Sequence, residues 1–285
     1  MVFFNYTTRK ERLSKNLYNK DMTFKALVFD LDGTLTPLAA QHCYPEVAPV
    51  LHQAKEKGLH IFIATGRSSF FVMKDLREET GVEAIVSANG MIVIDKDENT
   101  LAFHPIKKET FLAFVRDSRE KNYSAGFKFK DRIVVFNGYE HFIANYGAAK
   151  ENHYLIINAE DCEDPSIYGD SVDIFMFGDP DYFFSLRERF PDLTLILARK
   201  QACEAYPKGF NKFTGLQELL NSYGIREDEV IAFGDSENDE EMLKRCGLGI
   251  AMGNGTEGAK KAADFVTLPC DQDGIGHALR HFGIL

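Results

Sequence analysis

The sequence lacks the features of an exported, membrane-spanning or nucleic-acid-binding protein. Its five cysteines are odd in number and include no C-x-x-C pair, so we expect reduced thiols and a cytoplasmic location. No segment approaches the roughly 18 consecutive apolar residues of a membrane span. The formal net charge of −10 disfavours a surface for nucleic acid or for an anionic membrane. A small anionic ligand remains compatible with this charge, because local positive groups can hold it.

Repeats and low-complexity tracts are also missing, and the composition is that of a globular protein. The 285 residues, 45% of them hydrophobic, are enough for about two domains. Residues 1–21 are basic and polar and contain no continuous apolar segment, so they do not resemble a secretory signal. We expect 1–21 to be an extension that is either flexible or the result of a misassigned start codon, with Met22 as the alternative start.

Short apolar runs alternate with amphipathic segments along most of the chain. Near-continuous apolar runs are typical of parallel strands that are covered on both faces. Five such runs end in glycine or a polar residue: KALVFDLD, HIFIATG, AIVSANG, VIAFGD and GLGIAMG. A helix is predicted over SSFFVMKDLREET, with Ser68 as its N-cap. This alternation predicts an α/β fold with an open, mainly parallel sheet.

The segment 106–205 has a different pattern. It reads as a helix, two paired strands (GFKFK and RIVVFNG), and then further helices and strands. Strands of the parallel type resume at VIAFGD, so we expect an α+β domain at 106–205 that is inserted into a core domain formed by 22–105 and 206–285.

Polar residues follow the predicted parallel strands. Ligands of open α/β sheets bind outside the carboxyl ends of the strands, so we expect these residues to converge. The set comprises Asp30, Asp32, Thr34, Thr65, Gly66, Arg67, Lys212, Asp235, Ser236, Asn238 and Asp239. It combines carboxylates for a hard cation with a lysine, a hydroxyl and backbone N–H groups for an oxyanion.

Asp30 and Asp32 lie at the end of a predicted buried strand, where negative charge is costly. Mg²⁺ prefers a few carboxylate oxygens together with water and phosphate oxygens. A cation between this pair and Asp235 would offset the charges. Thr65 and Gly66 are predicted at the N-terminus of the helix that Ser68 caps, where free N–H groups favour a phosphate.

Four motifs in this order, FDLDGTLT, ATGR, the Lys212 region and GDSEND, resemble those of the haloacid dehalogenase superfamily, specifically its Cof-type (subfamily IIB) phosphatases. The segments SANG, AMGNG and KKAADFVT are similar to that branch as well. The resemblance runs from about Lys25 to the C-terminus. It implies a three-layer, Rossmann-like core with an inserted α+β cap of the C2B type.

The resemblance also implies a phosphoric monoester hydrolase that uses Mg²⁺. Asp30 would be the nucleophile that forms an aspartyl-phosphate, and Asp32 would be the general acid and base. Asp30 and Asp235 would bind Mg²⁺ by their side chains and Asp32 by its backbone carbonyl.

The remaining motif residues would support this centre. The phosphoryl oxygens would be held by Thr65, Gly66, Lys212 and Asn238. Thr34 would order the loop, and Asp239 would support the metal site without binding the ion directly. Lys208 is a rival to Lys212, and we prefer Lys212 because it stands where the family's GxxK pattern has it, after Gly209. Phe213 replaces a small residue that is common there.

Several alternatives stay open. GNGTEG matches a dinucleotide-binding fingerprint after a strand, but too few residues follow to complete such a sheet. A phosphomutase would share the aspartyl-phosphate, and a non-catalytic binding protein would not need the Asp32 partner of Asp30. The resemblance implies a small phosphorylated metabolite as the substrate, most commonly a sugar phosphate, with a flavin precursor or pyridoxal phosphate as the alternative. No nucleic-acid or membrane partner is expected, and the protein should be a monomer or a weak homodimer.

Overall fold

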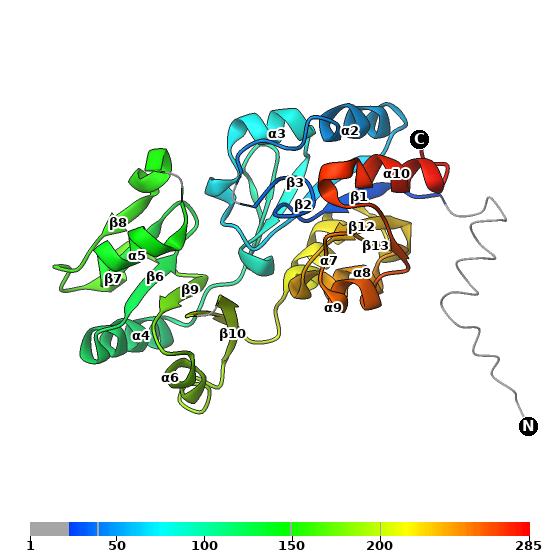
Figure 1. The fold of residues 1–285 in the computed structure, drawn as a ribbon. Coiled ribbons are helices and arrows are strands. Elements are labelled where there is room, and N and C mark those ends of the chain that lie inside the picture. The colour runs from blue at the N-terminus through cyan, green and yellow to red at the C-terminus, as the bar shows by residue number, and fades with distance from the viewer. Residues whose placement is uncertain (1–22, 39, 149, 200) are drawn as a thin grey trace, which may run out of the picture. The chain divides into compact units, whose positions relative to one another are not determined.

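The computed structural model describes residues 23–285 except 39, 149 and 200, and the elements can be followed in Figure 1. These residues form two compact units, one of 23–64, 74–84 and 219–285 and the other of 65–73 and 85–218. The predicted extension 1–21 lies outside the described residues. The boundaries of the core and the inserted domain at 105/106 and 205/206 stay predictions.

Among the described residues, eight strands form one sheet. Their spatial order is β14 (Phe265–Val266), β13 (Leu248–Ala251), β12 (Val230–Gly234), β1 (Ala26–Phe29), β2 (His60–Ala64), β3 (Ala84–Ser87), β4 (Ile92–Asp95) and β5 (Thr100–Phe103). The pairs from β14 to β2 are parallel, and β4 pairs with β5 in the antiparallel sense. The prediction of a mainly parallel sheet is therefore confirmed.

The central strands of this sheet are buried on both faces. All four residues of β1 have no exposed surface, as expected for a strand with a continuous apolar sequence. Helices α2 (Val47–Glu56), α3 (Lys74–Thr80) and α10 (Gly274–His281) lie on one side of the strands, and α8 (Glu240–Arg245) and α9 (Glu257–Ala262) lie on the other (Figure 1). This gives the predicted three-layer α/β arrangement.

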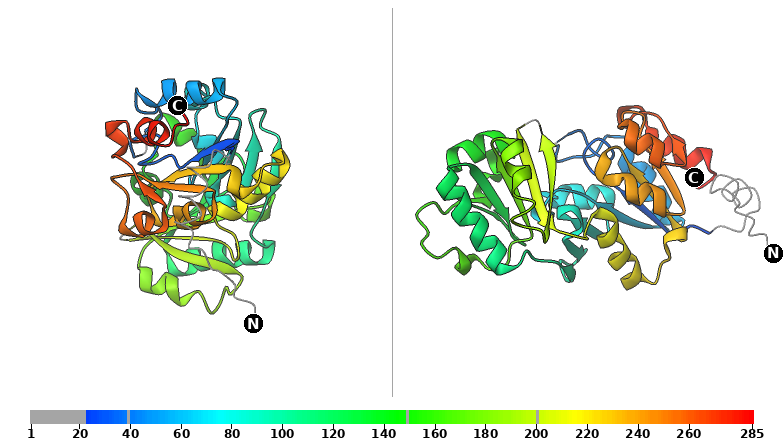
Figure 2. Two further views of the ribbon diagram at one scale, coloured as in Figure 1. Left: turned by 90° about the vertical axis from the view of Figure 1, so that its right-hand side faces the viewer. Right: turned by 90° about the horizontal axis from the view of Figure 1, so that it is seen from below.

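A second sheet has six described strands, in the order β10 (Leu193–Arg199), β11 (Ala202–Pro207), β9 (Asp173–Phe177), β6 (Ser124–Lys128), β7 (Ile133–Asn137) and β8 (Ile156–Asn158). The predicted pairing of GFKFK with RIVVFNG is confirmed, because β6 and β7 are antiparallel partners. Strands β7 and β8 pair in the parallel sense. The strands and the helices around them can be followed in Figure 2.

Two apolar clusters flank the six-stranded sheet. One joins α4 (Lys108–Lys121) and α6 (Pro180–Ser185) to strand residues such as Phe127 and Ile174. The other joins α5 (Tyr139–Tyr146) to Phe175 and Phe177. Successive strand residues point to opposite faces, which is why neighbouring positions of one strand belong to different clusters.

The helix predicted to begin after Ser68 differs in the structure. Ser69–Phe71 form a single 3-10 turn, and the α-helix begins only at Lys74. The Ser68 hydroxyl is buried but makes no capping hydrogen bond. Phe71 instead packs into the apolar cluster with Phe175, and this packing replaces a regular first helical turn.

The remaining long helix, α7, covers Lys212–Tyr223. Over the described part of the chain, no helix has both the length and the apolar character that a membrane crossing requires.

Candidate active site

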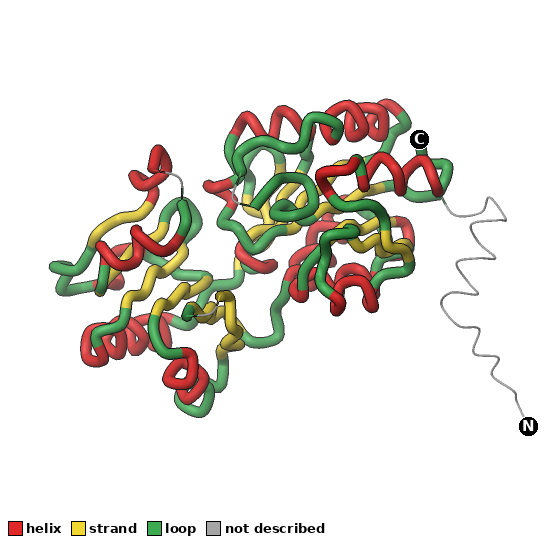
Figure 3. The backbone as a smooth tube through the Cα atoms, viewed as in Figure 1, coloured by secondary structure: helices red, strands yellow, loops and turns green. Residues whose placement is uncertain are grey.

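Asp30 is the first residue after β1. Figure 3 distinguishes the strands of the structure from the loops that follow them by colour. The Asp30 backbone N–H donates to the Phe233 carbonyl at 3.0 Å, which continues the pairing of β1 with β12. Its side chain is buried. The chain then turns back on itself, because the Leu31 carbonyl accepts from the N–H groups of Thr34, Leu35 and Thr36. The strand and this turn fix the position of the Asp30 carboxylate.

Asp235 follows β12, the neighbour of β1 in the sheet. The Thr34 hydroxyl donates to Asp235 Oδ1 at 2.9 Å. Gly33 lies between the two loops with φ of +84°, and a Cβ atom there would come within 2.7 Å of Asp235 Oδ2. Only glycine combines this backbone conformation with so close an approach. The DxDGT sequence therefore both supplies Asp30 and positions Asp235.

Asp239 holds the loop that carries Asp235. Its Oδ2 atom accepts from the backbone N–H groups of Asp235 and Ser236, both at 3.0 Å, and from the Ser236 hydroxyl at 3.2 Å. With the Ser236 side chain this forms a capping box at the short helical turn Glu237–Asp239. Asp239 has no exposed surface.

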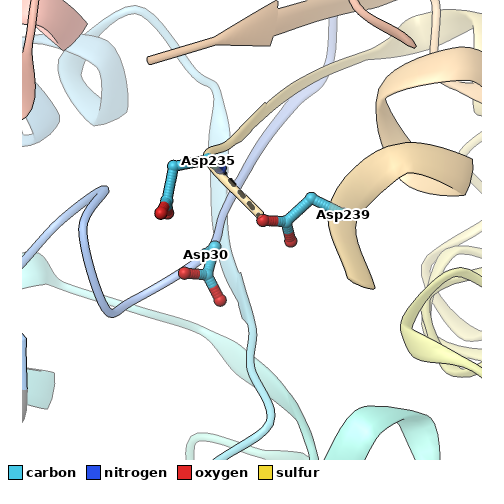
Figure 4. A group of neighbouring side chains, drawn as sticks. All are labelled: Asp30, Asp235 and Asp239. Atoms are coloured by element: carbon cyan, nitrogen blue, oxygen red, sulfur yellow. Dashed lines mark hydrogen bonds between the residues drawn. The ribbon is translucent and has the colours of Figure 1, made fainter. Parts of the chain in front are cut away.

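The three carboxylates of Asp30, Asp235 and Asp239 form a cluster (Figure 4). One carboxylate oxygen of each lies within 4.8 Å of those of the other two. Oxygen donors from carboxylates suit a hard divalent cation such as Mg²⁺, and the ion would offset the repulsion between partly desolvated negative charges. The donor set therefore fits the expected metal.

Thr65 and Gly66 follow β2 and are held by the segment after β3. The Thr65 N–H donates to the Val86 carbonyl at 2.8 Å, and the Thr65 carbonyl accepts from the Asn89 N–H at 3.1 Å. The Thr65 hydroxyl accepts from the Arg67 N–H at 3.1 Å, which closes a tight turn. Because the next α-helix begins only at Lys74, the backbone available to an anion here is that of the turn and not of a helix N-terminus.

Lys212 is the first residue of α7 and is almost completely buried, whereas its rival Lys208 is exposed. The start of α7 lies against Gly90, where a Cβ atom would meet the Asn211 carbonyl at 2.1 Å. The segment Ala88–Gly90 thus contacts both the Thr65 turn and the start of the Lys212 helix. Phe213, which departs from the family pattern, is buried in the core.

Two further predicted site residues are more open. Asp32 is half-buried on the turn after Asp30 and forms a bridge with Thr36. Asn238 is exposed, and its Oδ1 atom accepts from the Ser236 hydroxyl at 2.7 Å.

The segment after β13, GNGTEG, supports the carboxylate cluster in a way that the sequence did not reveal. The Asn254 carboxamide donates to the Gly33 carbonyl at 2.8 Å and accepts from the Cys270 N–H at 2.9 Å. The Thr256 N–H donates to the Asp235 carbonyl at 2.7 Å. Asn254 thus contacts the Asp30 loop, and Gly255, where a Cβ atom would lie 2.9 Å from the Asp235 carbonyl oxygen, packs against the Asp235 loop. The only available signal was the likeness of AMGNG to one phosphatase branch.

Several known proteins with similar sequences or structures are described as phosphatases. The chain is 26% identical to the putative phosphatase YkrA of Bacillus subtilis (strain 168), over 93% of this chain and 100% of that protein. It is also 26% identical to the 5-amino-6-(5-phospho-D-ribitylamino)uracil phosphatase YcsE of the same organism, over 94% and 99%. The solved structure of the subclass IIB sugar phosphatase BT4131 aligns with a TM-score of 0.77 at 27% identity, covering 92% of this chain and 100% of that one.

The sequence profile of one family spans most of the chain. The profile of haloacid dehalogenase-like hydrolases matches residues 27–279, which include the Asp30, Thr65, Lys212 and Asp235 motifs. The predictions of the superfamily, of the fold class and of a phosphatase-type hydrolase are confirmed. The chain belongs to the haloacid dehalogenase-like hydrolases.

Proposed function

We propose that this protein is a Mg²⁺-dependent phosphatase that hydrolyses small phosphorylated metabolites through an aspartyl-phosphate on Asp30. The observation that carries the proposal is the carboxylate cluster of Asp30 and Asp235, which follow the neighbouring strands β1 and β12, and Asp239 in the helical turn after Asp235. A buried nucleophile beside a cation site is suited to phosphoryl transfer, which depends mainly on positioning and on charge stabilisation.

In the first half-reaction, an oxygen of Asp30 attacks phosphorus while the bond to the leaving-group oxygen breaks. Asp32 donates a proton to that oxygen, so the product leaves as a neutral alcohol. In the second half-reaction, Asp32 takes a proton from water, and the resulting oxygen nucleophile attacks phosphorus and releases Asp30. Asp32 suits this role because its half-buried side chain lies on the turn that carries Asp30.

The metal would be held by the side chains of Asp30 and Asp235 and by the backbone carbonyl of Asp32. When bound, Mg²⁺ would lower the repulsion between the carboxylates and the phosphoryl oxygens. We assign Asp239 and Thr34 to support, because both hold the Asp235 loop through hydrogen bonds. Thr65, Gly66, Lys212 and Asn238 are proposed to hold the phosphoryl oxygens.

For the substrate we propose small phosphosugars, either hexose or pentose phosphates. The support is the similarity to a structure described as a sugar phosphatase. A flavin-precursor phosphatase is the alternative, because YcsE carries that activity in its name. The segment 106–205 is proposed to provide discrimination between leaving groups, since the roles proposed for the catalytic motifs involve only the metal, the phosphoryl group and the bridging oxygen, which all such substrates share.

A panel of phosphorylated metabolites tests the proposal. We expect Mg²⁺-dependent phosphate release with the highest kcat/KM for a hexose or pentose phosphate. A highest kcat/KM for the flavin precursor would reject the sugar assignment alone. Isomerised product without phosphate release would instead identify a phosphomutase, and binding without either product would identify a non-catalytic protein.

A further inference from the structure

Three ionisable side chains are buried together on the six-stranded sheet. Lys128 at the end of β6 is the register partner of Asp173 at the start of β9, and Glu204 lies on the adjacent strand β11. Their side chains are 3%, 0% and 10% exposed. Lys128 Nζ donates to Asp173 Oδ2 at 3.2 Å and to Glu204 Oε1. Burying such a group is costly unless every member is paired.

The pKa values of the two carboxyl groups of this cluster are shifted in opposite directions. Burial and the neighbouring Glu204 raise the pKa of Asp173 well above its usual range, which favours its protonated form. Burial alone would also raise the pKa of Glu204, but Lys128 and three hydrogen bonds outweigh it and lower that pKa. Glu204 is therefore the ionised partner of Lys128.

Glu204 extends this cluster to the turn after β2. Its Oε2 atom accepts from Asn89 Nδ2 at 3.1 Å, across 115 residues of sequence. Asn89 is buried in the segment after β3 and has a left-handed backbone, with φ of +53°. Its backbone N–H donates to the Thr65 carbonyl, and a Cβ atom on Gly66 would lie 3.1 Å from its Oδ1 atom. One end of the Asn89 carboxamide faces Glu204, and the other faces Gly66.

The charge on Glu204 determines which end of the carboxamide faces which neighbour. An ionised carboxylate can only accept hydrogen bonds, so the Nδ2 end of Asn89 must face Glu204. The Oδ1 end is then directed at the Gly66 backbone. Lys128 occupies the other oxygen of Glu204 and prevents the carboxylate from rotating away.

We infer that Glu204 is a positioning residue which, through Asn89, fixes the Thr65–Gly66 turn in the geometry that holds the phosphoryl group. This inference rests on the proposed function, because it takes the turn to be the phosphate-binding segment. A buried ion pair that only stabilises the sheet would not need a link to Asn89. Asp173 is also buried and also accepts a hydrogen bond from Lys128. It lies on β9, whereas the bond to Asn89 comes from Glu204 on β11, so Asp173 provides a matched control.

The test compares Glu204→Gln, Asn89→Ala, their combination and Asp173→Asn with the wild type. Glutamine keeps the size of Glu204 but offers one acceptor oxygen to the three side chains that hydrogen-bond to it, Asp173, Lys128 and Asn89, so at least one of these bonds is lost. For Glu204→Gln and for Asn89→Ala we expect kcat/KM, calculated per folded molecule, to fall about tenfold or more. A small displacement of a group that holds the substrate can lower the rate by up to about 100-fold. Asp173→Asn should stay within about twofold of the wild type.

Three readouts separate a positioning role of Glu204 from a merely stabilising one. If Glu204 acts through Asn89, adding Glu204→Gln to Asn89→Ala should have little further effect, so the two losses should not be additive. The affinity for inorganic phosphate, measured by calorimetry with Mg²⁺ present, should fall severalfold in both single variants. The Mg²⁺ concentration for half-maximal activity should be unchanged.

The outcomes also separate this inference from the proposed function. If the wild type binds inorganic phosphate without hydrolysing any phosphoester, the proposed function fails, and the phosphate affinities of the variants still decide the inference. If the wild type is an active phosphatase and Glu204→Gln behaves like Asp173→Asn, the inference is overturned alone. Fully additive losses would overturn it too, and a wild type that neither binds phosphate nor hydrolyses esters would overturn both.

Discussion

The Thr34 hydroxyl donates a 2.9 Å hydrogen bond to Asp235 Oδ1, across 201 residues of sequence. The bond orients one oxygen of the Asp235 carboxylate, while the Asp239 side chain holds the backbone of the same residue. Asp235 is thus fixed from two sides before any metal binds. Such preorganisation reduces the reorganisation needed when charge develops on a phosphoryl group.

Asp30→Asn should give a folded protein with almost no turnover. The amide keeps the shape of the carboxylate but is not a nucleophile, and β1 supports the residue through backbone bonds that do not depend on the side chain. Asp32→Asn should lower kcat by about 10² to 10⁴-fold, the usual contribution of a general acid and base. Steady-state phosphate release and thermal unfolding measure both effects. Hydrolysis by Asp30→Asn at nearly the wild-type rate would rule out the mechanism.

Removal of divalent metal should abolish activity, and Mg²⁺ should restore it. Asp235→Ala should raise the Mg²⁺ concentration for half-maximal activity sharply, because it deletes one of the proposed ligand side chains. A matched control is Asp228→Ala, at an exposed position in the same unit, which should leave that concentration unchanged. Activity that survives exhaustive chelation would contradict the assignment of the carboxylate cluster.

Gly33→Ala should cost both stability and activity. The new Cβ would combine a left-handed backbone with a 2.7 Å approach to Asp235 Oδ2. Gly58 provides a control, because its φ of +83° is nearly the same but a Cβ atom added there would meet no described atom within 4 Å. Gly58→Ala should lose about 1 kcal/mol of unfolding free energy from backbone strain and keep its kcat.

Urea unfolding and Mg²⁺ titration of both variants measure the difference. Gly33→Ala should lose more stability than Gly58→Ala and should also need more Mg²⁺. Equal Mg²⁺ requirements in the two variants would show that Gly33 does not help to position Asp235.

The positions of Asp30 and Asp235 at the ends of strands could be predicted from sequence. The first polar residue after a buried apolar strand lies at the edge of the sheet where the carboxyl ends of parallel strands meet. Asp30 and Asp235 are therefore found by local pattern alone. The first turn after Ser68 was predicted wrongly, since Phe71 packs into an apolar cluster that involves distant residues such as Phe175. The Asn89–Glu204 bond was out of reach for the same reason: it joins positions 115 residues apart that no periodicity connects.

Asp173→Asn should change how stability depends on pH. The raised pKa of Asp173 means that its carboxyl is protonated in the folded chain and ionised in the unfolded chain above the ordinary value of 3.8. The folded state then binds one more proton than the unfolded state. The contribution of Asp173 to the free energy of unfolding is therefore complete below pH 3.8 and is lost as the pH rises through the folded-state pKa. The expected slope is about 1.4 kcal/mol per pH unit in that window.

Asparagine copies the shape of the protonated acid and cannot ionise, so the variant should lack this slope. Near pH 4 the two proteins should have similar unfolding free energies, and the variant should become progressively more stable than the wild type as the pH rises toward the folded-state pKa of Asp173. Urea unfolding at several pH values measures the difference, and Asp161→Asn, at an exposed position in the same unit, should follow the wild type throughout. Parallel stability curves for Asp173→Asn and the wild type would mean that Asp173 is ionised in the folded chain, and Lys128 would then balance two buried carboxylates instead of one.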